Sequence, residues 1–90
     1  MKEKATNSVT NFQAESITEN ISVEFTRIVE ANNTTIAGSL MKDGEQVGDV
    51  SYDRKGDFQI VRIKPFSALT EDEMGKVYSS IPEYIKEMLS

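Results

Sequence analysis

The feature that most constrains the fold is a long, one-sided apolar pattern near the end of the 90-residue chain. Between Thr70 and Leu89 the apolar residues recur at intervals of three and four: Met74, Val77, Tyr78, Ile81, Ile85, Met88 and Leu89. This spacing predicts an amphipathic helix with one broad apolar stripe. Thr70 and Glu73 have the spacing of a capping box at its start. A helix of this kind must pack on an apolar surface, with Ile81 and Ile85 facing it.

Two residues interrupt the predicted helix. Pro82 cannot donate a helical hydrogen bond, so we expect a bend there without a reversal of direction. Gly75 indicates either a close approach to the surface beneath the helix or simple tolerance of an interior glycine.

The chain between the N-terminal region and this helix predicts four β-strands. Apolar and polar residues alternate from Ile21 to Val29, as in a half-buried strand. Three turn signals follow, at 32–33, 43–44 and 54–56, and they define further strands at 34–42, 45–53 and 57–64. Pro65 ends the last strand. The predicted fold class is therefore α+β: a four-stranded antiparallel β-meander followed by a C-terminal helix packed on one face (β-β-β-β-α).

The turns also predict which residues share a face. Pairing Lys42 with Glu45 puts Leu40 opposite Val47, and a bulge at Gly48 and Asp49 then restores the apolar phase. The resulting pairs are Val50 with Gly38, Tyr52 with Ile36, Phe58 with Tyr52, and Ile60 with Val50. We call the side that receives the helix the helix face. It is predicted to carry Ile21, Val23, Phe25, Val29, Ile36, Leu40, Val47, Val50, Tyr52, Phe58 and Ile60.

The opposite side, the open face, is predicted to hold a smaller apolar patch: Ile28, Ala37, Met41, Val61 and Ile63. The patch indicates either scattered surface residues or a partner surface. We favour a homodimer interface formed by Ile28, Met41, Val61 and Ile63. In a competing interpretation, Val9, Phe12 and Ile17 of the same chain cover this patch. Otherwise residues 1–18 are predicted to be a polar, mobile tail before a single domain at 19–90.

Composition excludes several classes of function. The net charge of −5 argues against a general binder of polyanions, whose affinity comes from Lys and Arg. The chain has no cysteine and no histidine, which removes thiolate chemistry and the commonest general base and metal ligand. No stretch resembles a signal peptide or a membrane span, so we expect a cytoplasmic protein. We predict no catalytic residue, cofactor or metal.

Arg27 is the most informative single residue. Alternation places it on the helix face, opposite Gly38, where a charged side chain needs a partner or a route to water. We expect its aliphatic part to lie under the helix, with its guanidinium paired to a carboxylate such as Glu83 or Glu87. A ligand for Arg27 is the alternative.

The segment 52–66 is the only basic region, and its candidate binding residues are Arg54, Lys55, Arg62, Lys64 and Phe66. Basic and aromatic residues interleaved on a hairpin are typical of proteins that bind single-stranded nucleic acid. The sequence therefore supports two functions: a small non-catalytic binding protein, homodimeric and with an unknown protein partner, or a single-stranded nucleic-acid binder.

Overall fold

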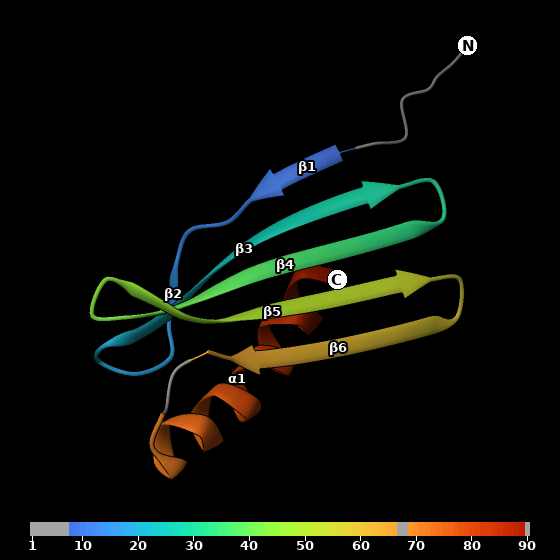
Figure 1. Cartoon of the computed structure of the whole chain (residues 1–90). Coiled ribbons are helices and arrows are strands. Elements are labelled where there is room, and N and C mark those ends of the chain that lie inside the picture. Colours follow the sequence, from blue (N-terminus) through green and yellow to red (C-terminus); the bar gives the residue numbers. More distant parts are fainter. Residues whose placement is uncertain (1–7, 67–68, 90) are drawn as a thin grey trace.

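The computed structural model describes residues 8–66 and 69–89 (Figure 1). These residues form an antiparallel sheet and one helix, an α+β fold. The strands are β1 (Ser8–Asn11), β2 (Glu15–Ser16), β3 (Ile21–Glu30), β4 (Asn33–Lys42), β5 (Glu45–Lys55) and β6 (Phe58–Pro65), and the helix is α1 (Glu71–Leu89).

The sheet has the strand order β1-β3-β4-β5-β6, and β2 also pairs with β3. From β3 to β6 each strand pairs with the next one in the chain, as the meander prediction requires. The number of strands is higher than the predicted four, because residues before Glu19 also pair: Val9 lies opposite Ile28, and Ser16 lies opposite Ser22. The predicted mobility of the tail remains a prediction, and residues 1–7 of it lie outside the described residues.

The β4–β5 hairpin follows from its turn. Asp43 and Gly44 both have positive φ values, 52° and 85°, as the mirror-image two-residue turn of a hairpin requires. The predicted pairs Val50 with Gly38 and Tyr52 with Ile36 are confirmed. The details of the bulge were wrong by one residue, because Leu40 lies opposite Gly48 and the unpaired extra residue is Val47.

The β5–β6 register differs from the prediction. The connection is a two-residue turn at Gly56 and Asp57, with Gly56 at φ 60°, and Lys55 pairs with Phe58. A turn one residue shorter than expected moves every side chain of β6 to the other face. Phe58 and Ile60 therefore lie on the open face and were wrongly assigned to the core; Phe58 is 64% exposed.

The core lies between α1 and the helix face of the sheet, since α1 lies behind the strands in Figure 1. Its buried sheet residues are Ile21, Val23, Phe25, Ile36, Leu40, Val47, Val50 and Tyr52. From α1 it takes Val77, Ile81, Ile85 and Met88, so the predicted burial of Ile81 and Ile85 is confirmed. The helix continues through Pro82.

The start of α1 is fixed by the predicted capping box. The Thr70 N–H donates to Glu73 Oε1 at 2.9 Å, and the Glu73 N–H donates to Thr70 Oγ1 at 3.1 Å. Lys42 Nζ lies 3.0 Å from Glu73 Oε2. The Thr70 backbone bond and then Lys42 lower the pKa of Glu73 below its usual value. These contacts therefore stabilise the fold at neutral pH and are lost as the pH falls through that lowered pKa.

Replacing two glycines with alanine is expected to change the free energy of unfolding in opposite directions. Nothing lies within 4 Å of a Cβ added at Gly75, whereas one at Gly48 would lie 2.9 Å from the Lys64 carbonyl oxygen of β6. We expect Gly75→Ala to raise the free energy of unfolding by about 0.5–1 kcal/mol, because alanine favours a helix interior. We expect Gly48→Ala to lower it by about 1–3 kcal/mol, because backbone must move. Urea unfolding measures both, and equal effects would contradict the packing described here.

Candidate functional site

Strand β6 is the long free edge of the sheet. It pairs with β5 on one side, and no described element pairs with its other side. The opposite edge is short, since β1 has 4 residues and β2 has 2. Because β6 has 8 residues, it offers the longer stretch of unpaired strand backbone within the described chain.

The register defines which backbone groups of β6 face outward. The two residues that flank a two-residue turn exchange two backbone hydrogen bonds, and Lys55 and Phe58 form such a pair. Because this bonding alternates along a strand, the backbone N–H and C=O groups of the even-numbered residues of β6 point toward β5. The bond from the Phe66 N–H to the Val47 carbonyl oxygen, at 2.7 Å, continues this alternation. The outward-facing backbone therefore belongs to the odd-numbered residues, which are Gln59, Val61, Ile63 and Pro65.

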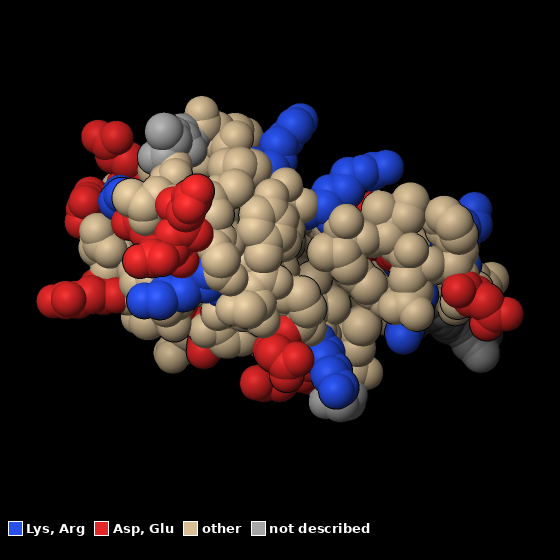
Figure 2. All heavy atoms as spheres, turned by 90° about the horizontal axis from the view of Figure 1, so that it is seen from below, with Lys and Arg blue, Asp and Glu red and all other residues tan. Residues whose placement is uncertain are grey.

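Exposed apolar side chains adjoin this edge on the helix face. Val61 lies opposite Tyr52 and is 46% exposed, while Ile63 lies opposite Val50 and is half-buried. From α1, Tyr78 is 47% exposed. Tyr84 contacts β2 and β3, and helical spacing places Tyr78 on the opposite flank of α1, which faces away from those two strands. Figure 2, which views the molecule from the side of β6 and α1, shows an uncharged surface across its middle with charged side chains around it.

The predicted dimer interface is not one patch. Ile28 and Met41 lie on the open face, in register with Thr35 and Gln46. Val61 and Ile63 lie on the helix face, so their predicted position beside Ile28 and Met41 was wrong. The reason is again the two-residue turn, which pairs Phe58 with Lys55 instead of Tyr52; this shift of three residues, an odd number, moves the side chains of β6 to the other face. The dimer itself remains a prediction.

The basic candidates divide between the faces. Lys55, Arg62 and Lys64 lie on the open face, and Arg54 lies on the helix face opposite Gln59. Lys64 lies opposite Asp49, which offsets part of its charge. Phe66 is 57% exposed, as expected of a candidate contact residue. Phe58 was missed as a second exposed aromatic side chain, because the predicted register placed it in the core.

Arg27 lies on the helix face, as predicted, but opposite Ile36 instead of Gly38. Its Nη1 donates to the Met88 carbonyl oxygen in the last turn of α1, and its guanidinium carbon lies 5.3 Å from the centre of the Phe12 ring. Cations near the C-terminus of a helix are favoured by its dipole. The predicted carboxylate pairing remains a prediction; Glu87 lines the same small cleft.

This cleft has a volume of about 170 Å³ between β3, the β1–β2 connection and the end of α1. The Arg27 Nε is buried there and has no hydrogen-bond partner among the described residues. Burial raises the pKa of Tyr84, and the Glu15 and Glu87 carboxylates add to that shift. Because Glu15 and Glu87 also line the cleft, an anionic ligand would meet repulsion as well as Arg27.

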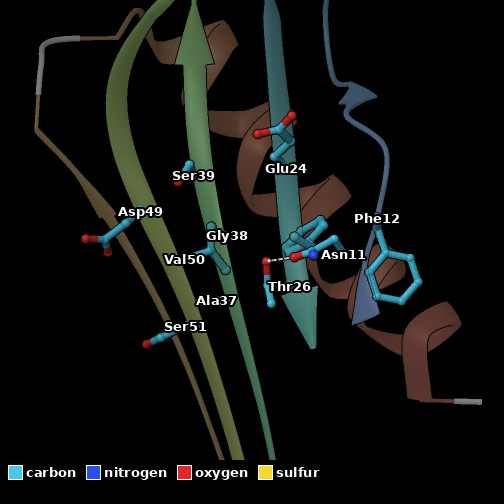
Figure 3. A pocket seen from close by; sticks show the side chains of 11 residues that line it. Asn11, Phe12, Glu24, Thr26, Ala37, Gly38, Ser39, Asp49, Val50 and Ser51 are labelled. Atoms are coloured by element: carbon cyan, nitrogen blue, oxygen red, sulfur yellow. Dashed lines mark hydrogen bonds between the residues drawn. The ribbon is translucent and has the colours of Figure 1, made fainter. Parts of the chain in front are cut away.

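A larger hollow of about 670 Å³ lies on the open face (Figure 3). Small residues of β4 and β5 form its floor: Ala37, Gly38, Ser39 and Ser51. Glu24 and Asp49 flank Ser39 in one cross-strand row, and Thr26 donates to Asn11 at 2.9 Å. The hollow is wide and polar, and it brings together no constellation that resembles a catalytic or metal site.

Within residues 8–66 and 69–89, no group of three carboxylate, histidine or cysteine residues could hold a metal ion. The described helix is not long and apolar enough to cross a membrane. No protein-family model, no curated protein and no solved structure matches the chain.

Arg27 gives a second prediction. We expect Arg27→Ala to lower the free energy of unfolding by about 1–3 kcal/mol, because it removes a charged hydrogen bond and the packing of the aliphatic stem. A double-mutant cycle with Phe12→Leu should give a coupling of about 0.5–1 kcal/mol from the cation–π contact. Arg62→Ala, at an exposed position, is the matched control and should unfold like the wild type. An Arg27→Ala protein as stable as the control would contradict this role.

Proposed function

We propose that this chain is a small non-catalytic binding protein whose binding surface is the β6 edge with the adjoining flank of α1. The observation that carries the proposal is the free 8-residue edge strand. Gln59, Val61 and Ile63 direct backbone donors and acceptors outward, and Val61 and Tyr78 are exposed apolar residues beside them. Addition of a strand to a free edge is a common mode of protein recognition, in which the backbone supplies affinity and alternate side chains supply specificity.

Charge at this edge supports a selective partner. Natural sheets protect free edges with cations and proline, and β6 has Arg62, Lys64 and Pro65. Pro65 protects only the end of β6 at which it lies, and the Arg62 and Lys64 side chains lie on the open face. The outward backbone groups around Val61 therefore stay available to a partner strand that can lie beside these two cations.

The inventory of reactive groups supports a non-catalytic role. The chain has no histidine and no cysteine. Among its carboxylates, Glu73 belongs to the capping box and Asp53 accepts a hydrogen bond from Thr35 at 3.3 Å. A cytoplasmic location belongs to the same proposal.

The proposal predicts where a partner touches the protein. A photo-crosslinking amino acid at position 61 or 78 should join the full-length protein to another polypeptide in a cell extract, because both positions adjoin the edge. The matched control is position 9, where Val9 is 64% exposed on the opposite edge strand, β1. Crosslinking at 9 but not at 61 or 78 would place the binding surface elsewhere and contradict the proposal.

A single-stranded nucleic-acid binder is the second candidate, and the β6 register favours it in one respect. Phe58, Arg62 and Lys64 lie on the open face, so an exposed aromatic ring stands on the same strand face as two cations. Phe66 adds a second exposed ring just beyond the strand. Stacking on such rings and contacts of cations with phosphates are how single strands are bound without sequence preference.

Titration of labelled single-stranded DNA and RNA tests the second candidate. Binding should weaken steeply as salt rises, and Arg62→Glu with Lys64→Glu should abolish it, because both changes place carboxylates beside phosphates. Lys76→Glu with Lys86→Glu, at two exposed positions of α1, is the control of equal charge change. Absence of binding even at low salt would eliminate this candidate.

A further inference from the structure

We infer that the partner at the β6 edge is a second copy of this chain, paired antiparallel about a two-fold axis that passes beside Val61. This inference rests on the proposed function and names the partner of that same surface. Two copies of β6 then form one continuous sheet, and both α1 helices lie on the same side of it. The backbone, the side chains and the end charges of β6 each favour this arrangement.

The backbone favours this register because it uses all the outward N–H groups of β6, which belong to Gln59, Val61 and Ile63. With Val61 opposite Val61 of the second copy, Gln59 lies opposite Ile63 and Ile63 opposite Gln59. These are the residues whose N–H and C=O groups point outward, so each pair can exchange two hydrogen bonds. Pro65, which lacks an N–H, lies beyond the last of these pairs. If the axis passed beside Ile60 instead, Ile63 would lie opposite the turn residue Asp57, and the hydrogen bonds of the Ile63 backbone would be lost.

The side chains favour the same register. On the open face Arg62 lies opposite Ile60 of the second copy, and Lys64 lies opposite Phe58, so each cation meets an apolar residue. Centring the axis on Arg62 places two Arg62 side chains face to face, and centring it on Ile63 places Arg62 opposite Lys64. Like charges directly opposite each other destabilise a strand pair. On the helix face the exposed Val61 side chains bury each other.

Charge at the two ends of β6 is complementary in this arrangement. The β5–β6 turn carries Arg54 and Lys55 beside Asp57, while Pro65 leads toward the first turn of α1, which carries Glu71, Asp72 and Glu73. The turn and the start of α1 lie at opposite ends of β6 (Figure 1). An antiparallel partner therefore brings its basic turn toward the acidic start of α1 of the first copy.

The assembly closes at two copies. After β6 is paired, the free edges among the described residues are those at β1, which has 4 residues and is shorter than the 8-residue β6. The pairing of two 8-residue β6 strands buries less than a standard interface of about 1,600 Å². We therefore expect a dimer that dissociates on dilution.

Sedimentation velocity on the full-length protein over a wide concentration range tests the dimer. The wild type should change reversibly from monomer to dimer as its concentration rises. Val61→Pro should raise the dissociation constant by about tenfold or more, because it removes a central donor from both strands without removing a bond to β5. Circular dichroism should show Val61→Pro folded, and Val9→Asp on β1 should dimerise like the wild type. A wild type that stays monomeric into the millimolar range overturns the inference.

Single cysteines test the register in a chain that has none of its own. In the proposed register the two position-61 Cα atoms lie about 5.5 Å apart, within the range of a disulfide. Those of position 62 are diagonal neighbours about 7–8 Å apart, beyond that range. Mild oxidation should therefore crosslink Val61→Cys much faster than Arg62→Cys. Faster crosslinking of Arg62→Cys overturns the register.

The two proposals fail in different ways. Crosslinks from position 61 to a different polypeptide, with a monomeric wild type, leave the binding surface in place and overturn the second copy as partner. No crosslink at 61 or 78 together with a monomeric wild type overturns both. A dimer unaffected by Val61→Pro overturns both, because it uses another surface.

Discussion

The rest of the structure depends on the burial of one helix stripe against one face of a sheet. Val77, Ile81, Ile85 and Met88 pack on that face, and its buried residues extend from Ile21 on β3 to Tyr52 on β5. Polar contacts of α1 include one at each end, where Glu73 meets Lys42 and the Met88 carbonyl accepts from Arg27. Hydrophobic burial brings the layers together, while these end contacts fix the direction in which the helix crosses the strands.

The sequence predicted the parts of the fold in which two independent signals agree. Between β4 and β5 the Asp43–Gly44 turn and the apolar alternation lead to the same pairs, so Val50 and Tyr52 could be paired correctly. In β6 they do not agree. Ile60, Val61 and Ile63 fit either face, and Gly56 fits a turn of two or three residues. An edge strand that is half-covered carries too weak an apolar pattern to decide between these registers.

The candidate site was less predictable than the core for a related reason. Alternation alone placed Arg27 on the helix face, but its contacts with Phe12 and Met88 arise only when distant segments meet. Strand β1 was missed because Ser8–Asn11 contains one large apolar residue, Val9, which stays exposed. The meander prediction already places the last strand at an edge of the sheet, but it does not decide which side chains of that strand lie on each face. The exposed residues of β6 could be assigned to the two faces only once the length of the β5–β6 turn was known.

The place of α1 in the chain has a consequence for synthesis on the ribosome. Each hairpin from β3 to β6 joins neighbouring segments, so the strands can pair soon after they leave the exit tunnel. The helix that covers them is made after all of these strands. Until its final turn has emerged, Ile36, Leu40 and Val50 lack the helix that buries them, and exposed apolar surface of this kind is prone to aggregation. Translation speed over 71–89 should therefore influence the yield of folded protein.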